Sequence, residues 1–146
     1  MGYERLHAID DTPGKADVEF LDHQLELFNK QATGKDDFRS LNLIIRDEEK
    51  AVIAGLKAVT GWDWLYIQVL WVEADHRRKR VGSQLLRQAE DKARQRGCIG
   101  SCLSSYSFQA PEFYTYHGYT NFGKIVDYPK GNTMFFLSKR FNTGES

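Results

Sequence analysis

The sequence predicts an α/β protein built on a mixed β-sheet. Segments with strand periodicity alternate with amphipathic helical segments along the chain, which is the order typical of α/β folds. The longest nearly continuous apolar run, residues 64–72, has the length and composition of a central strand buried on both faces. A chain of 146 residues is sized for one hydrophobic core, so we expect a single domain over residues 1–146.

The first half of the chain is expected to contain four strands and one helix. The helix follows the breaker Pro13-Gly14 and ends before Gly34. Its apolar residues recur at helical spacing: Val18, Leu21, Leu25 and Phe28. The strand-like runs lie at residues 3–9, 41–45, 51–59 and 64–72, with a polar turn at 47–50 that makes a hairpin of the second and third runs.

The second half is expected to contain two helices and three strands. The first of these helices ends at Gly97 and carries the charged pair Glu90 and Arg94, four residues apart, on its solvent face. Its apolar face is formed by Val81, Leu85, Leu86, Ala89 and Ala93. The remaining elements are a strand, a short helix and two hairpin strands, at residues 98–103, 111–117, 119–126 and 133–137.

Composition and charge argue against several classes of function. The chain has 20 basic and 20 acidic residues, so its net charge is zero, and we expect neither nucleic acid nor a membrane as a partner. We expect no signal peptide and find no run of about 18 apolar residues, which indicates a cytoplasmic protein. The two cysteines, Cys98 and Cys102, and the four scattered histidines lack metal-ligand spacing, so we expect no metal.

A basic turn joins the central strand to the helix that follows it. The run from His76 to Arg80 lies where a helix N-terminus already offers unpaired N–H groups and a partial positive charge. Acidic residues are normally favoured there, so a basic run is locally unfavourable and indicates function. A ligand with several phosphates suits such a turn. The alternatives are a solvated turn without a ligand and a local contact with nucleic acid.

Two motifs resemble those of the GNAT superfamily of acyl-CoA-dependent N-acetyltransferases. Residues 77–82, Arg-Arg-Lys-Arg-Val-Gly, are similar to its pattern of Arg or Gln, any two residues, Gly, any residue, then Gly or Ala, with Arg80 replacing the first glycine. Residues 113–119, Phe-Tyr-Thr-Tyr-His-Gly-Tyr, are similar to its later motif of Tyr, three residues, Gly and an aromatic residue. The resemblance implies a mixed, mostly antiparallel central sheet with a splayed parallel strand pair and helices on both faces.

The resemblance also implies that acetyl-CoA is the co-substrate and that its acetyl group passes directly to a primary amine. Tyr114 matches the family's general acid, which protonates the departing thiolate. If the family's glycine has a left-handed backbone, Arg80 costs about 1–2 kcal/mol there. The residues implied in acetyl-CoA binding are Leu70, Trp71, Val72, Arg77, Arg78, Lys79, Arg80, Val81, Gly82, Ser83, Ser107 and Gln109.

The sequence leaves three questions open: which residue is the catalytic base, which amine is the acceptor, and whether the chain is an active enzyme. Val69 stands where many family members have a glutamate base, which leaves a water relay or one of three acidic residues: Glu73, Asp63 and Asp127. The acceptor is a small-molecule or protein amine, and in this family segments corresponding to residues 28–38 and 126–133 select it. Polyamines, aminoglycoside-like drugs and amino acids are among the alternatives. The chain is either an active enzyme, with a homodimer left open, or a degenerate acyl-CoA-binding module.

Overall fold

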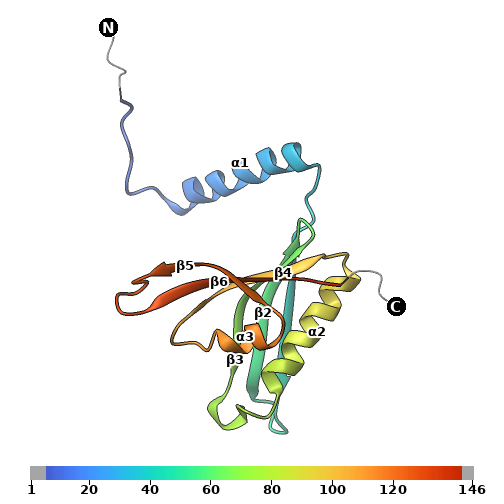
Figure 1. Cartoon of the computed structure of the whole chain (residues 1–146). Coiled ribbons are helices and arrows are strands. Elements are labelled where there is room, and N and C mark those ends of the chain that lie inside the picture. The colour runs from blue at the N-terminus through green and yellow to red at the C-terminus, as the bar shows by residue number, and fades with distance from the viewer. Residues whose placement is uncertain (1–5, 143–146) are drawn as a thin grey trace. The chain divides into compact units, whose positions relative to one another are not determined.

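The computed structural model describes residues 6–142 and divides the chain into two compact units, Met1–Asp36 and Asp37–Ser146 (Figure 1). The first unit contains helix α1, and the second contains the sheet and the remaining helices. Each unit has its own internal structure and is described by itself. The expectation of one domain over residues 1–146 stays a prediction.

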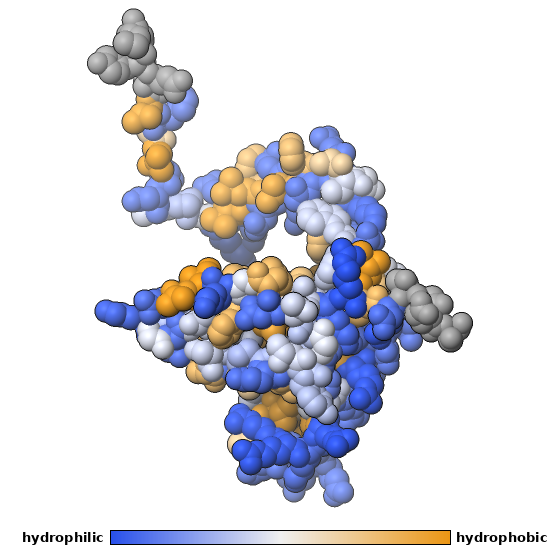
Figure 2. All heavy atoms as spheres, in the orientation of Figure 1, coloured by the Kyte–Doolittle hydropathy of each residue, from blue (hydrophilic) through white to orange (hydrophobic). Residues whose placement is uncertain are grey.

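Helix α1 (Lys15–Thr33) forms where the helical spacing predicted it. Gly34 ends the helix at φ 71°, and its N–H donates to the carbonyl of Lys30 over 2.8 Å. No residue of α1 is buried, and apolar side chains lie at its surface in Figure 2. The expected strand at residues 3–9 is wrong for residues 6–9, because none of the described strands pairs with them; residues 3–5 lie outside the described part of the chain.

The second unit is built on a six-stranded sheet in the order β1-β2-β3-β4-β6-β5. Neighbouring strands are antiparallel except for β3 and β4, which run parallel. The predicted mixed, mostly antiparallel sheet is therefore confirmed. The strands are β1 (Arg39–Arg46), β2 (Val52–Gly61), β3 (Trp64–Val72), β4 (Gly100–Tyr106), β5 (Thr120–Val126) and β6 (Thr133–Arg140).

Strands β3 and β4 pair at one end only. The aligned residues are Trp64 with Gly100, Leu65 with Ser101 and Tyr66 with Cys102. Beyond them β3 continues to Val72 and β4 to Tyr106 with no further pairing between the two strands. The strands therefore splay, as the resemblance implied, and residues 67–72 of β3 present an edge that has no partner strand in β4.

Gly100 lies where the two parallel strands come together. A Cβ atom at this position would lie 2.6 Å from the carbonyl oxygen of Lys139 and 2.6 Å from Cζ3 of the Trp64 indole. Heavy atoms do not approach that closely without displacement, so only glycine fits between β6 and the Trp64 ring. The closed end of the splayed pair depends on this glycine.

Helix α2 (Val81–Gln95) packs along one face of the sheet (Figure 1). Its predicted apolar face is buried at Leu85, Leu86, Ala89 and Ala93, while Val81 packs against the core from its edge. Burial of a leucine side chain stabilises the fold by about 1.5–3 kcal/mol. Helix α3 (Glu112–Tyr116) contributes Tyr114 to the same core cluster.

The strand expected at residues 98–103 begins two residues later, at Gly100. The N–H of Cys98 donates to the carbonyl of Ala93 over 2.9 Å, and the N–H of Ile99 donates to the carbonyl of Asp63 over 2.7 Å. These bonds close α2 and tie the connection to the β2–β3 turn, so neither residue joins the sheet. Both cysteines are free.

The expectation that Glu90 lies on the solvent face of α2 is wrong. The residue is only 5 % exposed. Its Oε2 accepts a hydrogen bond from the Tyr119 hydroxyl over 2.8 Å, and its Oε1 lies 2.8 Å from Nζ of Lys139. The Tyr119 hydroxyl also lies 2.9 Å from Oγ of Ser101. A buried carboxylate is tolerated only when it is paired and hydrogen-bonded in this way.

Candidate active site

The basic turn has a strained backbone. A short 3-10 helix, Ala74–His76, leads into Arg77, and the next residues include two with left-handed backbones, Arg78 at φ 63° and Arg80 at φ 64°. Each such residue with a Cβ atom costs about 1–2 kcal/mol. The left-handed backbone at Arg80 is the conformation that the glycine of the family pattern would favour. Strain of this kind clusters at functional sites.

The N-terminus of α2 is available to an anion. Arg80 is the N-cap residue, no side chain caps the helix, and its first turn contains no acidic residue. Unpaired N–H groups and the helix dipole together favour a bound phosphate at such an end. Of the predicted binding residues, Val81, Gly82 and Ser83 form this first turn.

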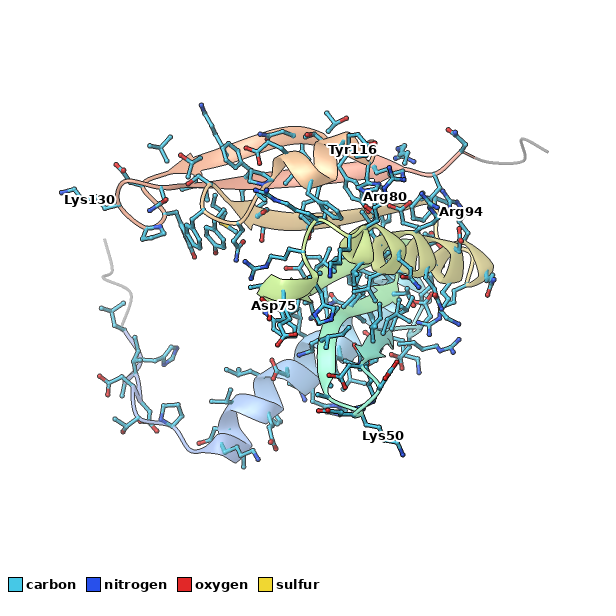
Figure 3. All side chains as sticks on the ribbon, turned by 90° about the horizontal axis from the view of Figure 1, so that it is seen from below. Lys50, Asp75, Arg80, Arg94, Tyr116 and Lys130 are labelled. Atoms are coloured by element: carbon cyan, nitrogen blue, oxygen red, sulfur yellow. The ribbon has the colours of Figure 1, made fainter. Side chains whose placement is uncertain are left out.

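The basic side chains do not all have the same role. Nε of Arg77 donates to the carbonyl of Val72 over 3.0 Å, so this side chain fastens the turn to the end of β3. Lys79 and Arg80 line one end of a hollow of about 590 Å³ that continues along α2 past Arg87 and Asp91 to Gln95. Figure 3 labels Arg80 at the start of that helix. Arg78 is exposed in the same turn.

The predicted strand residues lie on the open edge of β3. Leu70, Trp71 and Val72 pair with Leu56, Gly55 and Ala54 of β2, respectively, and have no partner in β4. Leu70 and Val72 pack against the core, whereas Trp71 is largely exposed. An extended ligand that adds to a sheet edge needs this combination of a fixed strand and a vacant side.

Contacts between side chains bring α3 against the first turn of α2. The Phe113 ring lies beside Gly82, where an added Cβ atom would be 3.4 Å from Cζ of Phe113, an ordinary van der Waals distance. Oγ of Ser83 and Nε2 of His117 are 2.8 Å apart. The two motifs of the resemblance, separated by some thirty residues in sequence, are thus neighbours in the fold.

His117 is a residue at the site for which the sequence analysis considered no role except that of a metal ligand. Its Nε2 bonds to Ser83 and its ring lies against Phe113, with ring centroids 4.8 Å apart. Burial lowers the pKa of His117, which favours the neutral ring. Its place directly before Gly118 in the second motif was the available signal.

Tyr114 is buried between two aromatic rings. Its ring meets those of Phe113 and Tyr119 edge-on, with centroids 5.1 Å and 5.7 Å away. Burial raises the pKa of Tyr114 to about 12. The hydroxyl has no hydrogen-bond partner among residues 6–142. No side-chain nitrogen or oxygen in that range is both unpaired and completely buried, so the Tyr114 hydroxyl retains some contact with solvent. Tyr114 therefore keeps its proton at neutral pH.

Ser107 and Gln109 lie in the loop after β4, and both make bonds within the protein. Oγ of Ser107 donates to Oδ1 of Asn132 over 3.0 Å and accepts from the N–H of Thr133 over 3.1 Å. Oε1 of Gln109 accepts from the N–H of Tyr106 over 3.1 Å. These bonds fasten the loop to the β5–β6 hairpin. A contact of either residue with pantetheine stays a prediction.

The candidate bases lie in three separate places. Glu73 follows β3 directly, and its Oε2 is 3.0 Å from Nδ1 of His76. Asp63 belongs to the β2–β3 turn at the closed end of the parallel pair, and Asp127 lies in the β5–β6 turn. Val69, at the family's base position, is half-exposed on β3. Of the three carboxylates, Glu73 is the one next to the open part of β3.

Neither a metal site nor a membrane span was found in residues 6–142. No group of three or more His, Cys, Asp or Glu side chains in that range is placed to hold a metal ion. No helix in the same range is both long and apolar enough to cross a bilayer.

The site thus combines an uncapped helix N-terminus beside a basic turn, an open strand edge and a buried phenol. Comparison with known proteins gives the class of protein. The model of the Acetyltransferase (GNAT) family matches residues 4–119. The chain belongs to this family and is an acetyltransferase.

Individual relatives agree with this assignment. The chain is 34% identical over 117 residues to acetyltransferase Atu2258 of Agrobacterium fabrum, which covers 80% of this chain and 85% of that protein. It is 42% identical over 93 residues to blasticidin-S acetyltransferase of Streptomyces morookaense, covering 63% and 68%. A crystal structure of an acetyltransferase from Bacillus cereus has a TM-score of 0.84 and 31% identity over 92% of this chain and 98% of that chain.

Proposed function

We propose that the protein transfers the acetyl group of acetyl-CoA to a primary amine, in the cytoplasm, and releases CoA and the N-acetylated product. One observation carries the proposal. The vacant edge of β3 leads into the turn before the uncapped N-terminus of α2, and α3, which carries Tyr114, is linked to the first turn of α2 by the bond between Ser83 and His117. A thioester donor with a diphosphate needs those three features within the reach of one ligand.

Acetyl-CoA would bind along two elements. Its pyrophosphate would accept hydrogen bonds from the N–H groups of residues 81–83, and the guanidinium and ammonium groups of the basic turn would neutralise it. Its pantetheine arm would pair with the main chain of residues 67–72 like an added strand. The hollow at Lys79, Arg80 and Arg87 would receive the ribose phosphate.

The chemistry is a direct displacement. The amine nitrogen attacks the thioester carbon, the carbonyl becomes an oxyanion, and the C–S bond breaks as the carbonyl re-forms. Tyr114 donates its proton to the departing sulfur, and the amine gives up one proton to a base or to water. A main-chain N–H of the open β3 edge would stabilise the oxyanion. No acyl-enzyme intermediate forms.

The amine must reach the thioester in its neutral form. A primary amine with a pKa near 10.4 loses its proton at neutral pH at a cost of roughly 4–5 kcal/mol. Glu73 is our first candidate for the base because it directly follows the open segment of β3 and already holds His76. Glu73→Gln would lower the rate at pH 7 and move the pH optimum upward if it serves in this way.

Two measurements test the proposal. Calorimetric titration gives the affinity for acetyl-CoA, and a thiol assay follows CoA release with a panel of amines that includes blasticidin S, polyamines, aminoglycosides, amino acids and peptide N-termini. We expect binding together with amine-dependent CoA release. Binding without release across the panel would instead favour a degenerate acyl-CoA-binding module, and failure to bind would reject both functions.

A further inference from the structure

A second hollow, of about 390 Å³, lies at the opposite end of β4 from Gly100. It is lined by Tyr106, Phe108, Asp127, Tyr128 and Pro129. It is a shallow depression that is open to solvent, so a ligand in it would keep one side exposed. None of these residues belongs to the acetyl-CoA site described above, and all lie within the unit Asp37–Ser146.

Three aromatic rings form a stack at this hollow. The ring of Tyr106 lies nearly parallel to that of Phe108, with centroids 5.3 Å apart and planes 14° apart. The ring of Tyr128 stacks on Tyr106 at 5.9 Å and 29°. Phe108 remains 62 % exposed and Tyr128 49 % exposed. Aromatic faces left open to solvent carry a negative potential and attract flat or cationic groups.

One carboxylate stands at the wall of the stack. Asp127 has a left-handed backbone, φ 63°, and its Oδ1 accepts a hydrogen bond from the N–H of Gly131 over 3.0 Å. The bond of the Tyr128 N–H to the carbonyl of Asn132, 3.0 Å long, closes the same turn. The carboxylate is thus held in place before any ligand arrives. Lys130, at the tip of the turn, extends outward in Figure 3.

The hollow adjoins the proposed reaction site through the chain itself. Tyr106 is the last residue of β4, beyond the segment that pairs with β3, and residues 107–111 lead from it directly to α3 and Tyr114. The bonds of Ser107 to Asn132 and Thr133 tie this loop to the turn that carries Asp127. A ligand in the hollow would therefore lie at the open end of the splayed strands.

We propose that this hollow is the acceptor subsite and that it takes a primary amine whose other end is a flat, positively charged group such as a guanidinium. The inference rests on the proposed function, because it identifies the acceptor of that reaction. A flat cation satisfies both features at once: its face stacks on the rings and its charge pairs with Asp127. A neutral flat group loses the charge pair, and a compact ammonium loses most of the stacking.

Calorimetry with three related amines tests the assignment. Agmatine carries a guanidinium, N-carbamoylputrescine has the same shape with a neutral urea, and putrescine is cationic without a flat group. With CoA already bound, we expect agmatine to bind the wild-type protein about tenfold more tightly than either of the others, which corresponds to about 1.4 kcal/mol.

Two variants separate charge from stacking. Asp127→Asn keeps an oxygen for the Gly131 N–H and removes only the charge, so agmatine should fall to the affinity of N-carbamoylputrescine, which should itself be unchanged. Phe108→Leu should weaken both flat amines by about threefold and leave putrescine unchanged. Asp47→Asn is the matched control, because Oδ1 of Asp47 also accepts backbone N–H groups in a hairpin turn, at the other end of the unit.

Several results would overturn the proposal. These are equal affinity for agmatine and its urea analogue, no measurable agmatine binding, an equal loss in the Asp47→Asn control, and displacement of agmatine by CoA, which would assign the hollow to the coenzyme. Failure of the proposed function is a different result. In that case acetyl-CoA does not bind, or CoA is not released, while agmatine still binds in an Asp127-dependent way.

Discussion

Arg80 combines backbone strain with a place in the proposed phosphate site. Its left-handed backbone was expected from the glycine that the family pattern has at this position, whereas nothing in the sequence indicated that Arg78 would share the conformation. Pattern analysis recognises left-handed positions by glycine or asparagine. An arginine gives no such sign, so Arg78 could not be recognised at all and Arg80 only through the glycine that it replaces.

Replacement of Arg80 by glycine separates strain from ligand binding. We expect Arg80→Gly to raise the free energy of unfolding by up to about 1 kcal/mol, because relief of the left-handed backbone exceeds the added entropy of the unfolded chain. Acetyl-CoA affinity should fall by no more than about tenfold, since Arg78 and Lys79 and the helix N-terminus remain. Urea unfolding and calorimetry measure the two effects. Arg78→Gly is the matched variant, and complete loss of binding in Arg80→Gly would contradict the expectation.

Tyr114 is expected to affect turnover and not donor binding. Tyr114→Phe keeps the buried ring and removes the proton, so kcat should fall by about 100-fold, near the lower end of the range for general acids, while KM for acetyl-CoA stays within about twofold. The thiol-release assay measures both constants. Tyr116→Phe, a change in the same helix at a residue that is 84 % exposed, should leave both constants unchanged. Equal turnover of the Tyr114 variant and the wild type would remove Tyr114 from the mechanism.

At the scale of elements, α2 is the best-predicted part of the fold and also the part with the clearest error. Periodicity identified its apolar face, and the sequence analysis placed the basic run at its N-terminus, where the structure shows no side-chain cap. Glu90 was misassigned because helical spacing reveals partners three or four residues away only. The predicted pair with Arg94 is present, with Nη2 of Arg94 4.0 Å from Oε1 of Glu90. Two further partners, Tyr119 just before β5 and Lys139 in β6, are brought beneath the helix by the tertiary fold.

The buried group around Glu90 is expected to stabilise the contact between α2 and the sheet. Glu90→Gln preserves shape and an acceptor for the Tyr119 hydroxyl but removes the charge that faces Lys139. We expect a loss of about 1–3 kcal/mol in the free energy of unfolding, measured with urea. Asp91→Asn changes the neighbouring residue, whose bond to Arg94 lies at the surface, and should cost less than about 0.5 kcal/mol. Equal losses of unfolding free energy in Glu90→Gln and Asp91→Asn would mean that the buried charge of Glu90 does not stabilise the fold.

For the whole molecule, the mixed sheet and the order of its six strands along the chain followed from periodicity and turn residues, with strand ends off by at most three residues, whereas the further strand expected at residues 3–9 is wrong for residues 6–9. The splay of β3 and β4 came from the resemblance alone, because no local pattern records where two strands cease to pair. The hollow at Tyr106 was anticipated only in part. The segment 126–133, which the resemblance implied in acceptor selection, contains Asp127, Tyr128 and Pro129, but no sequence pattern linked it to Tyr106 and Phe108, which lie about twenty residues earlier.

Alkaline pH should destabilise the whole molecule. Burial raises the pKa of Tyr114 to about 12. The pKa of Tyr119 is also raised, mainly by burial and secondly by the negative charge of Glu90. A tyrosine whose pKa is higher in the folded state makes its full contribution to the free energy of unfolding below the pKa of the unfolded chain, near 10. That contribution is lost as the pH rises towards the pKa of the folded state. Tyr114 alone should therefore account for about 2–3 kcal/mol lost between pH 10 and pH 12. Across that interval the urea midpoint of Tyr114→Phe should fall less steeply than that of the wild type. The midpoint of Tyr116→Phe should fall as steeply as that of the wild type.

The tight packing of Gly100 between Trp64 and β6 has a consequence for donor selectivity. A methyl group inserted there would collide with the Lys139 carbonyl and the Trp64 ring, so we expect β4 to shift relative to β3 and β6 and the separation of the two strands between Leu70 and Tyr106 to change. Preference between acetyl and longer acyl thioesters would then be adjustable from a residue that never meets the donor. Engineering the range of acyl donors that this enzyme accepts would start at Gly100 and leave the proposed reacting groups unchanged.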